Sequence, residues 1–174
     1  MDDLLRFPVG KCPKLKTIGS DQLKQWTKAI EEFPSRVKTA VEGLSDKELD
    51  NPYRKDGWTI RQLVHHLADS HMNAYVRFKL ALTEKRPVIK PYVQDLWAKQ
   101  PDYEGPIDPS LGILEGVHHR WAKLLHSMKP EDFEQTYVHP EYNDEYDLKE
   151  SLCQYEWHCR HHLAHIELAK KNYK

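Results

Sequence analysis

Histidines at helical spacing are the residues of this sequence best suited to metal chemistry, and there are eleven of them. His158 and His162 are four residues apart, so on a helix their side chains lie on one face. On an earlier predicted helix, His66 lies on a polar ridge beside the apolar stripe. If these two helices face each other, three neutral imidazoles surround one point and leave a coordination position open, as in catalytic zinc sites. His66, His158 and His162 are therefore candidate ligands of a divalent metal.

The other histidines point in different directions around their helices, because each residue advances by about 100°. His65 is turned away from His66 and is expected to be mostly exposed. His161 is expected to be the histidine of the last helix that is turned furthest toward solvent. His118 and His119 are adjacent and cannot both face one metal, so we interpret them as surface or pocket-rim residues. Spacing alone leaves metal binding and ordinary packing equally open, and the lack of an H-E-x-x-H motif argues against a zincin protease.

Four helices are predicted to position these residues. Each has apolar residues at intervals of three or four, the pattern of a helix with one buried face. Pro34 lies inside the first helix and is expected to kink or break it. Thr59 with Gln62 and Asp147 with Glu150 form capping pairs at the starts of the second and fourth helices. The four predicted segments are residues 20–44, 59–85, 108–128 and 147 to near the C-terminus.

These helices predict an all-α fold, an antiparallel four-helix bundle that forms a single domain over residues 1–174. Residues 86–107 are rich in proline and are predicted to form a long irregular loop with one short turn around residues 94–99. That loop is long enough to connect helices that are not neighbours. Residues 136–146 are predicted to form a loop or a small hairpin.

Composition and charge narrow the possible functions. Lys and Arg number 26 and Asp and Glu 27, so the net charge of -1 excludes a strongly basic nucleic-acid-binding protein. No apolar stretch approaches the roughly 18 residues of a membrane span, and the N-terminal residues lack the apolar core of a secretory signal. Three cysteines without a C-x-x-C pair argue against a disulfide framework. We therefore expect a cytoplasmic protein that binds neither nucleic acid nor membrane.

The sequence WTIRQLVHHL at residues 58–67, together with His158-x-x-x-His162, resembles the DinB-like superfamily and in particular its YfiT-like branch. The resemblance covers nearly the whole chain. It implies a four-helix bundle, a homodimer, and one divalent metal per chain, zinc or nickel, held by His66, His158 and His162. Many relatives follow the last ligand with Arg-Gly-Gln, where this chain has Leu-Ala-His. His165 ends that tripeptide and lies near the ligand face, but the resemblance assigns it no role.

Members of that branch are described as metal-dependent hydrolases, which implies a metal that activates water for attack on a small-molecule substrate. A metal also deprotonates a thiol that binds to it. The resemblance therefore leaves an alternative open, a metal-dependent S-transferase that joins a low-molecular-weight thiol such as bacillithiol to electrophiles. A third possibility is a non-catalytic metal-binding stress protein.

Two further side chains are candidates for roles in this chemistry, and one thiol is predicted to take no part in it. Asp69 follows His66 by three residues, so it is a candidate general base or a partner that orients an imidazole. Arg77 is a candidate for binding a carboxylate of the substrate. Cys159 points into the apolar stripe of its helix and is predicted to be an inert core thiol.

Overall fold

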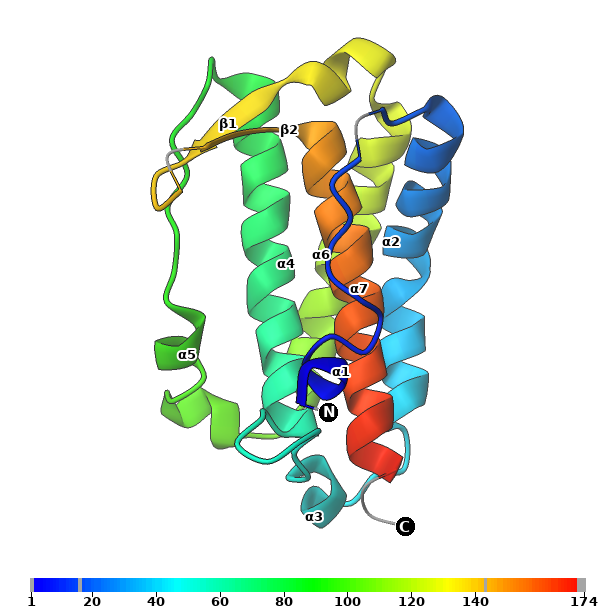
Figure 1. Cartoon of the computed structure of the whole chain (residues 1–174), viewed down its shortest axis with the longest axis vertical. Coiled ribbons are helices and arrows are strands. Elements are labelled where there is room, and N and C mark those ends of the chain that lie inside the picture. The colour runs from blue at the N-terminus through cyan, green and yellow to red at the C-terminus, as the bar shows by residue number, and fades with distance from the viewer. Residues whose placement is uncertain (1, 16, 143, 172–174) are drawn as a thin grey trace.

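Four long helices form the body of the molecule in the computed structural model, which describes residues 2–15, 17–142 and 144–171 (Figure 1). The predicted four-helix bundle is confirmed. Its core is apolar and contains fully buried side chains from all four helices, among them Phe33, Leu67, Trp121 and Leu152. The four helices are α2 (Ser20–Val41), α4 (Ile60–Thr83), α6 (Asp108–Ser127) and α7 (Leu148–Lys171).

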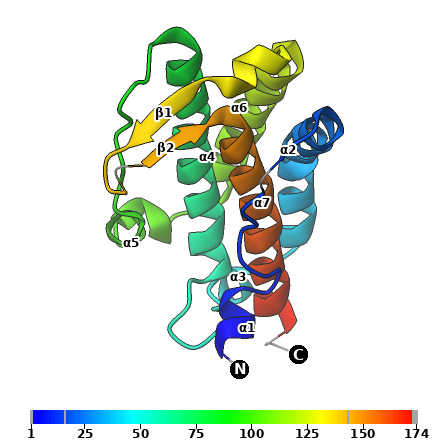
Figure 2. The same ribbon diagram turned by 45° about the horizontal axis from the view of Figure 1, so that its top comes forward.

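The order of the helices in space differs from their order in the chain. Figures 1 and 2 show α2 and α4 on opposite sides of the bundle, with α6 and α7 between them. Residues 84–107 carry the chain back along the length of α4 before α6 begins. As a result α4 and α6 run in the same direction, whereas α4 and α7 are antiparallel, so the bundle is only partly antiparallel. This long crossover is what allows α4 to face α7 directly.

Short elements lie at the ends and along the sides of the bundle (Figures 1 and 2). The segment between α4 and α6 holds α5, which confirms the predicted short turn, and one 3-10 helix that was not predicted. Residues 136–139 and 144–147 pair as an antiparallel hairpin in which Thr136 is opposite Asp147, and Val88 forms a bridge to Val138 of this hairpin. The short elements are α1 (Asp2–Arg6), α3 (Asp46–Leu49), α5 (Gln94–Trp97), η1 (Pro101–Glu104), η2 (Pro130–Glu134), β1 (Thr136–His139) and β2 (Asp144–Asp147).

Pro34 was expected to kink or break its helix, and the break does not occur, since α2 continues through it. A proline in a helix has no N–H to donate to the carbonyl four residues earlier, which here belongs to Ile30. The Ile30 carbonyl instead accepts a hydrogen bond from Nδ1 of His118 on α6, at 2.5 Å. A side chain of a neighbouring helix thus replaces the backbone donor that Pro34 removes.

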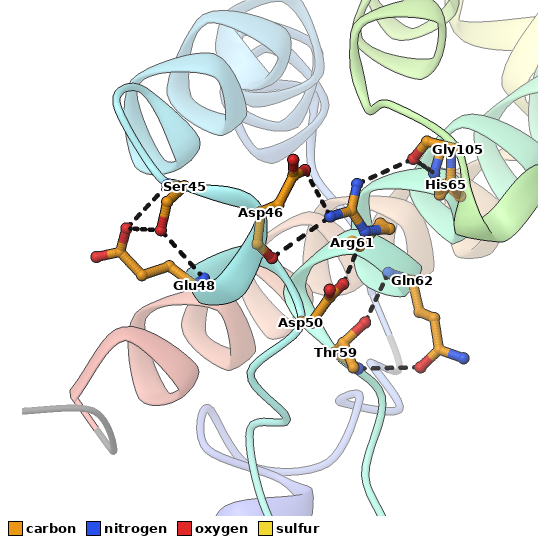
Figure 3. Close-up of polar contacts among 9 residues, drawn as sticks. All are labelled: Ser45, Asp46, Glu48, Asp50, Thr59, Arg61, Gln62, His65 and Gly105. Carbon is orange, nitrogen blue, oxygen red and sulfur yellow. Dashed lines mark hydrogen bonds and ion pairs between the residues drawn. The ribbon is translucent and has the colours of Figure 1, made fainter.

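Capping and one buried arginine fix the start of α4 (Figure 3). Thr59 and Gln62 form the predicted capping box, in which the hydroxyl of Thr59 accepts from the backbone N–H of Gln62. Arg61 is buried and donates to the carboxylates of Asp50 and Asp46, at 2.7 and 2.8 Å. It also donates to the Gly105 carbonyl at 3.0 Å. These bonds tie the first turn of α4 to α3 and to the segment before α6, and so fix the direction in which the α4 histidines point.

None of the helices in the described part of the chain is both long and apolar enough to span a membrane.

Candidate metal centre

Three histidines from two helices converge at one point inside the bundle. His66 comes from α4, and His158 and His162 come from α7; one potential ligand nitrogen from each lies within 4.8 Å of the other two. Nε2 of His66 and Nε2 of His158 are 3.2 Å apart. Two nitrogens bound to one zinc ion at the tetrahedral angle are separated by about 3.3 Å, given Zn–N bonds of about 2.0–2.1 Å. The donor set and its spacing therefore fit a divalent metal, as the sequence predicts.

Burial keeps these three imidazoles neutral. It lowers the pKa of His66 to about 3, with the nearby His161 as a smaller cause. Burial also lowers the pKa values of His158 and His162 well below the ordinary value, and the neighbouring histidines lower them further. A neutral imidazole offers a lone pair to a metal without first losing a proton. The three rings are thus in the form that binds a metal at neutral pH.

Trp58 packs on two of the three histidines, and the third lines a cavity. The Trp58 ring lies 4.6 Å from that of His66 and stacks on His162 at 6.4 Å, between ring centroids. His158 is half-buried and forms part of the wall of a cavity of about 390 Å³. That cavity is lined mainly by polar and aromatic side chains from α4, the hairpin, the segment before α5 and α7, including Ser70, Arg77, Tyr92, Tyr137, Tyr155 and His158.

Arg77 is the cation in the wall of this cavity. Its Nη1 donates to the hydroxyl of Tyr155 at 3.0 Å. Its Nε is buried and has no hydrogen-bond partner among the residues that the structure describes. A guanidinium beside a cavity is suited to bind a carboxylate or phosphate. The structure thus places Arg77 in the wall of the cavity that His158 also lines.

Asp69 lies apart from the three histidines. Its carboxylate accepts a hydrogen bond from the hydroxyl of Tyr103 in η1, at 2.6 Å. Burial raises the pKa of Asp69, and the Tyr103 bond opposes that rise. No hydrogen bond in the described part of the chain joins Asp69 to His66, His158 or His162. The structure therefore gives this carboxylate a partner outside the candidate metal centre.

Three expectations about the remaining histidines are wrong. His65 is buried, with Nδ1 at 2.8 Å from Ser110 Oγ and Nε2 at 3.3 Å from the Gly105 carbonyl, because α6 packs on that face of α4. His161 is only 7% exposed because Trp157 stacks on it and Phe7 of the N-terminal segment covers it. His118 is fully buried between α2 and α4, whereas its neighbour on α6 is exposed as predicted.

Two further histidines contact the centre: His71, which was not predicted, and His165, which was expected near the ligand face but without a role. Nε2 of His71 is 3.1 Å from Nδ1 of His158, and Nδ1 of His165 is 3.3 Å from Nδ1 of His162. His71 lies about 140° from His66 around α4, on the edge of the apolar stripe. A histidine on a buried face requires a hydrogen-bond partner, and that requirement was the signal in the sequence. The expectation for Cys159 is consistent with its burial, which raises the pKa of its thiol well above the ordinary value.

Comparisons with known proteins agree with this geometry. The family model of the DinB superfamily matches residues 29–166. A "putative metal-dependent hydrolase" of Bacillus cereus strain 03BB102 is 48% identical over 98% of both chains, and one of Bacillus mycoides strain KBAB4 is 48% identical over 93% of both.

A solved structure gives the same result for the fold. YfiT from Bacillus subtilis is described as a probable metal-dependent hydrolase with an unusual four-helix bundle topology. It is 41% identical to this chain, with a TM-score of 0.94 over 98% of both chains. Identity at this level over nearly full length shows common descent as well as a common fold. The chain therefore belongs to the DinB superfamily, among its YfiT-like members.

Proposed function

We propose that the protein is a metal-dependent hydrolase that acts on a small molecule with an anionic group. The observation that carries this proposal is the position of His158, which belongs both to the three-histidine centre and to the wall of the cavity beside it. A ligand in that cavity is therefore adjacent to the metal position. When bound, a divalent metal with an open position supplies Lewis acidity, which activates water for attack on an electrophile.

The protein's own residues would hold the metal, exclude water and orient the substrate. His66, His158 and His162 would hold one divalent ion per chain, with zinc or nickel as the proposed metals. Trp58 covers two of these rings and keeps water from that side. Arg77 would bind the anionic group of the substrate, because it is the cation in the wall of the cavity. A cytoplasmic location and a homodimer are also part of the proposal.

Hydrolysis by the zinc-loaded and nickel-loaded protein tests this proposal. We expect turnover of small esters, amides or phosphoesters that carry a negative charge, and none by the metal-free protein. Arg77→Met should raise KM for charged substrates without changing metal content, because it removes a cation but fills a similar volume. Uncharged analogues are the control, and their KM should not change. Equal KM values for charged substrates in both proteins would contradict the role proposed for Arg77.

A second candidate function is metal-dependent transfer of a low-molecular-weight thiol to an electrophile. The observation that favours it is the position of Asp69, the proposed base, whose carboxylate is bonded to Tyr103 and not to the centre. Attack by a thiolate needs no general base once the thiol has lost its proton. The same assay with a panel of thiols distinguishes the two. Turnover that requires a thiol supports the transferase, turnover without one supports the hydrolase, and neither supports a non-catalytic metal-binding protein.

A further inference from the structure

Histidines outside the three-histidine centre form two hydrogen-bonded chains that lead into it. One chain consists of the Ile30 carbonyl, His118, His71 and His158, and we name it the His118 chain. The other consists of the Arg6 carbonyl, His165 and His162, and we name it the His165 chain. We infer that His71, His118 and His165 are positioning residues, which fix the protons of His158 and His162 on Nδ1 and leave both Nε2 lone pairs free for a metal.

The direction of every bond in the His118 chain follows from its first acceptor. A carbonyl oxygen can only accept, so Nδ1 of His118 carries a proton and donates it to Ile30 at 2.5 Å. His118 is neutral because burial lowers its pKa to about 4, so its Nε2 bears a lone pair. That lone pair accepts from Nδ1 of His71 at 2.6 Å.

The same reasoning applies to the next link. His71 is fully buried and its hydrogen bonds in the described part of the chain are to other imidazoles, so its ring is neutral, and with its proton on Nδ1 its Nε2 is an acceptor. Nδ1 of His158 lies 3.1 Å away and must be the donor. Nε2 of His158 is then unprotonated, and this is the nitrogen that faces His66. The tautomer of a candidate ligand is thus determined by a backbone carbonyl two helices away.

The Ile30 carbonyl is available because of Pro34. In an uninterrupted helix this oxygen would accept from the N–H of residue 34, which proline lacks. Without the His118 bond, the carbonyl would be a buried acceptor with no partner, which is costly. Pro34 therefore leaves the Ile30 carbonyl free to accept from His118, and His118 supplies the donor that Pro34 lacks, across the contact between α2 and α6.

The His165 chain is shorter and has the same logic. The Arg6 carbonyl lies in the last turn of α1, where helical carbonyls have no intrahelical donor. Nε2 of His165 donates to it at 3.3 Å, and its Nδ1 is then an acceptor. Nδ1 of His162 lies 3.3 Å from that acceptor and must donate, which leaves Nε2 of His162 unprotonated. This chain gives the N-terminal segment a role at the metal centre, and it assigns a function to His165.

The chains contact the two ligands from α7 directly and reach His66 only through His158. In the metal-free protein Nε2 of His66 lies 3.2 Å from the unprotonated Nε2 of His158 and is therefore the donor, while its Nδ1 is buried and has no hydrogen-bond partner among the described residues. Partners that orient metal-bound imidazoles change metal affinity by about 10- to 100-fold when they are removed. We expect an effect of this size because an unsupported ring can present a protonated nitrogen to the metal.

The tautomers can be observed directly in the metal-free protein. Long-range ¹H–¹⁵N spectra of histidine-labelled protein distinguish a proton on Nδ1 from one on Nε2. We expect Nδ1–H and an unprotonated Nε2 for both His158 and His162. A proton on Nε2 of either ring would overturn the inference. This experiment requires neither metal nor substrate.

Variants of His118 test the effect on metal binding at a residue that touches no candidate ligand. His118→Leu should weaken zinc binding by about 10- to 100-fold and let the His158 proton exchange between its two nitrogens. His118→Gln, whose amide both donates and accepts, should recover affinity. His119→Leu is the matched control, because this exposed neighbour on the same helix lies outside both chains.

Two results with His118→Leu would overturn the inference. One is zinc affinity equal to that of the unchanged protein. The other is weaker affinity with an unaltered His158 tautomer, because the loss would then come from packing alone. The inference rests on the proposed metal site but not on hydrolysis. Zinc binding without turnover would contradict only the proposed reaction, whereas the tautomer spectra test only the chains.

Discussion

His65 and His66 are adjacent in the sequence, but their rings point about 100° apart around α4 and meet different partners. His66 faces His158, whereas His65 contacts Ser110 and the Gly105 carbonyl. We expect His66→Ala to remove most of the bound metal, because only two imidazoles of the centre would be left. We expect His65→Ala to keep the metal but to lower the free energy of unfolding by about 1–3 kcal/mol, since it leaves buried polar groups unpaired.

Metal analysis after gel filtration and urea denaturation of the metal-free proteins measure the two effects separately. His119→Ala, on the exposed face of α6, is the control and should change neither quantity. Metal bound by His66→Ala at the level of the unchanged protein would show that His66 is not a ligand. Loss of metal from His65→Ala without loss of stability would show that the two neighbours were assigned the wrong roles.

At the scale of elements, Pro34 links the stability of α2 to the metal centre. A proline in a helix interior costs about 3 kcal/mol relative to alanine, so Pro34→Ala should stabilise the metal-free protein by up to that amount. The new N–H at residue 34 would compete for the Ile30 carbonyl and weaken its bond with His118. We therefore expect zinc affinity to fall by about three- to tenfold although the fold becomes more stable.

Urea denaturation and zinc competition with a chromophoric chelator measure these opposite changes. A purely structural role for Pro34 would not produce them, because a better-folded protein should bind its metal at least as well. An unchanged or increased zinc affinity in Pro34→Ala would therefore contradict the coupling between α2 and the centre.

Helical spacing predicts much of the fold and the three candidate ligands because it records one buried face of each helix. It placed His66, His158 and His162 correctly on the faces that meet between α4 and α7. It failed for His118 and His161 because a helix in a bundle contacts more than one neighbour, so the buried arc is wider than the apolar stripe. Which element covers the rest of the arc depends on the crossover between α4 and α6, and no local pattern encodes that.

At the scale of the molecule, metal binding should stabilise the whole fold. His66 and the two ligands of α7 are 92 and 96 residues apart in the sequence, and the unfolded chain does not hold them together. A ligand that binds only the native state stabilises it by about 2.7 kcal/mol at a free concentration of 100 Kd. We expect zinc to raise the thermal midpoint of the unchanged protein and a chelator to reverse the rise. His66→Ala should show neither change, and a similar rise in that variant would indicate zinc binding elsewhere.

The number of buried neutral histidines should also make the metal-free molecule sensitive to acid. His118 is an example, because burial holds its pKa at about 4 in the native state, against about 6.5 when unfolded. Between these values the unfolded chain binds a proton that the native protein does not. The free energy of unfolding therefore falls as pH decreases below 6.5, by up to about 1.4 kcal/mol per pH unit for this group. Above pH 6.5 His118 is neutral in both states and does not make the free energy of unfolding depend on pH.

His118→Leu removes this one group from the balance. Urea denaturation of both metal-free proteins between pH 7 and pH 5 should give a shallower pH dependence for the variant, by up to the same 1.4 kcal/mol per pH unit. The variant is expected to be less stable at pH 7, because Ile30 and His71 lose a hydrogen-bond partner. The two stability curves should therefore converge as the pH falls. Parallel curves would mean that His118 binds a proton equally well in both states, and would contradict the neutral ring on which the His118 chain depends.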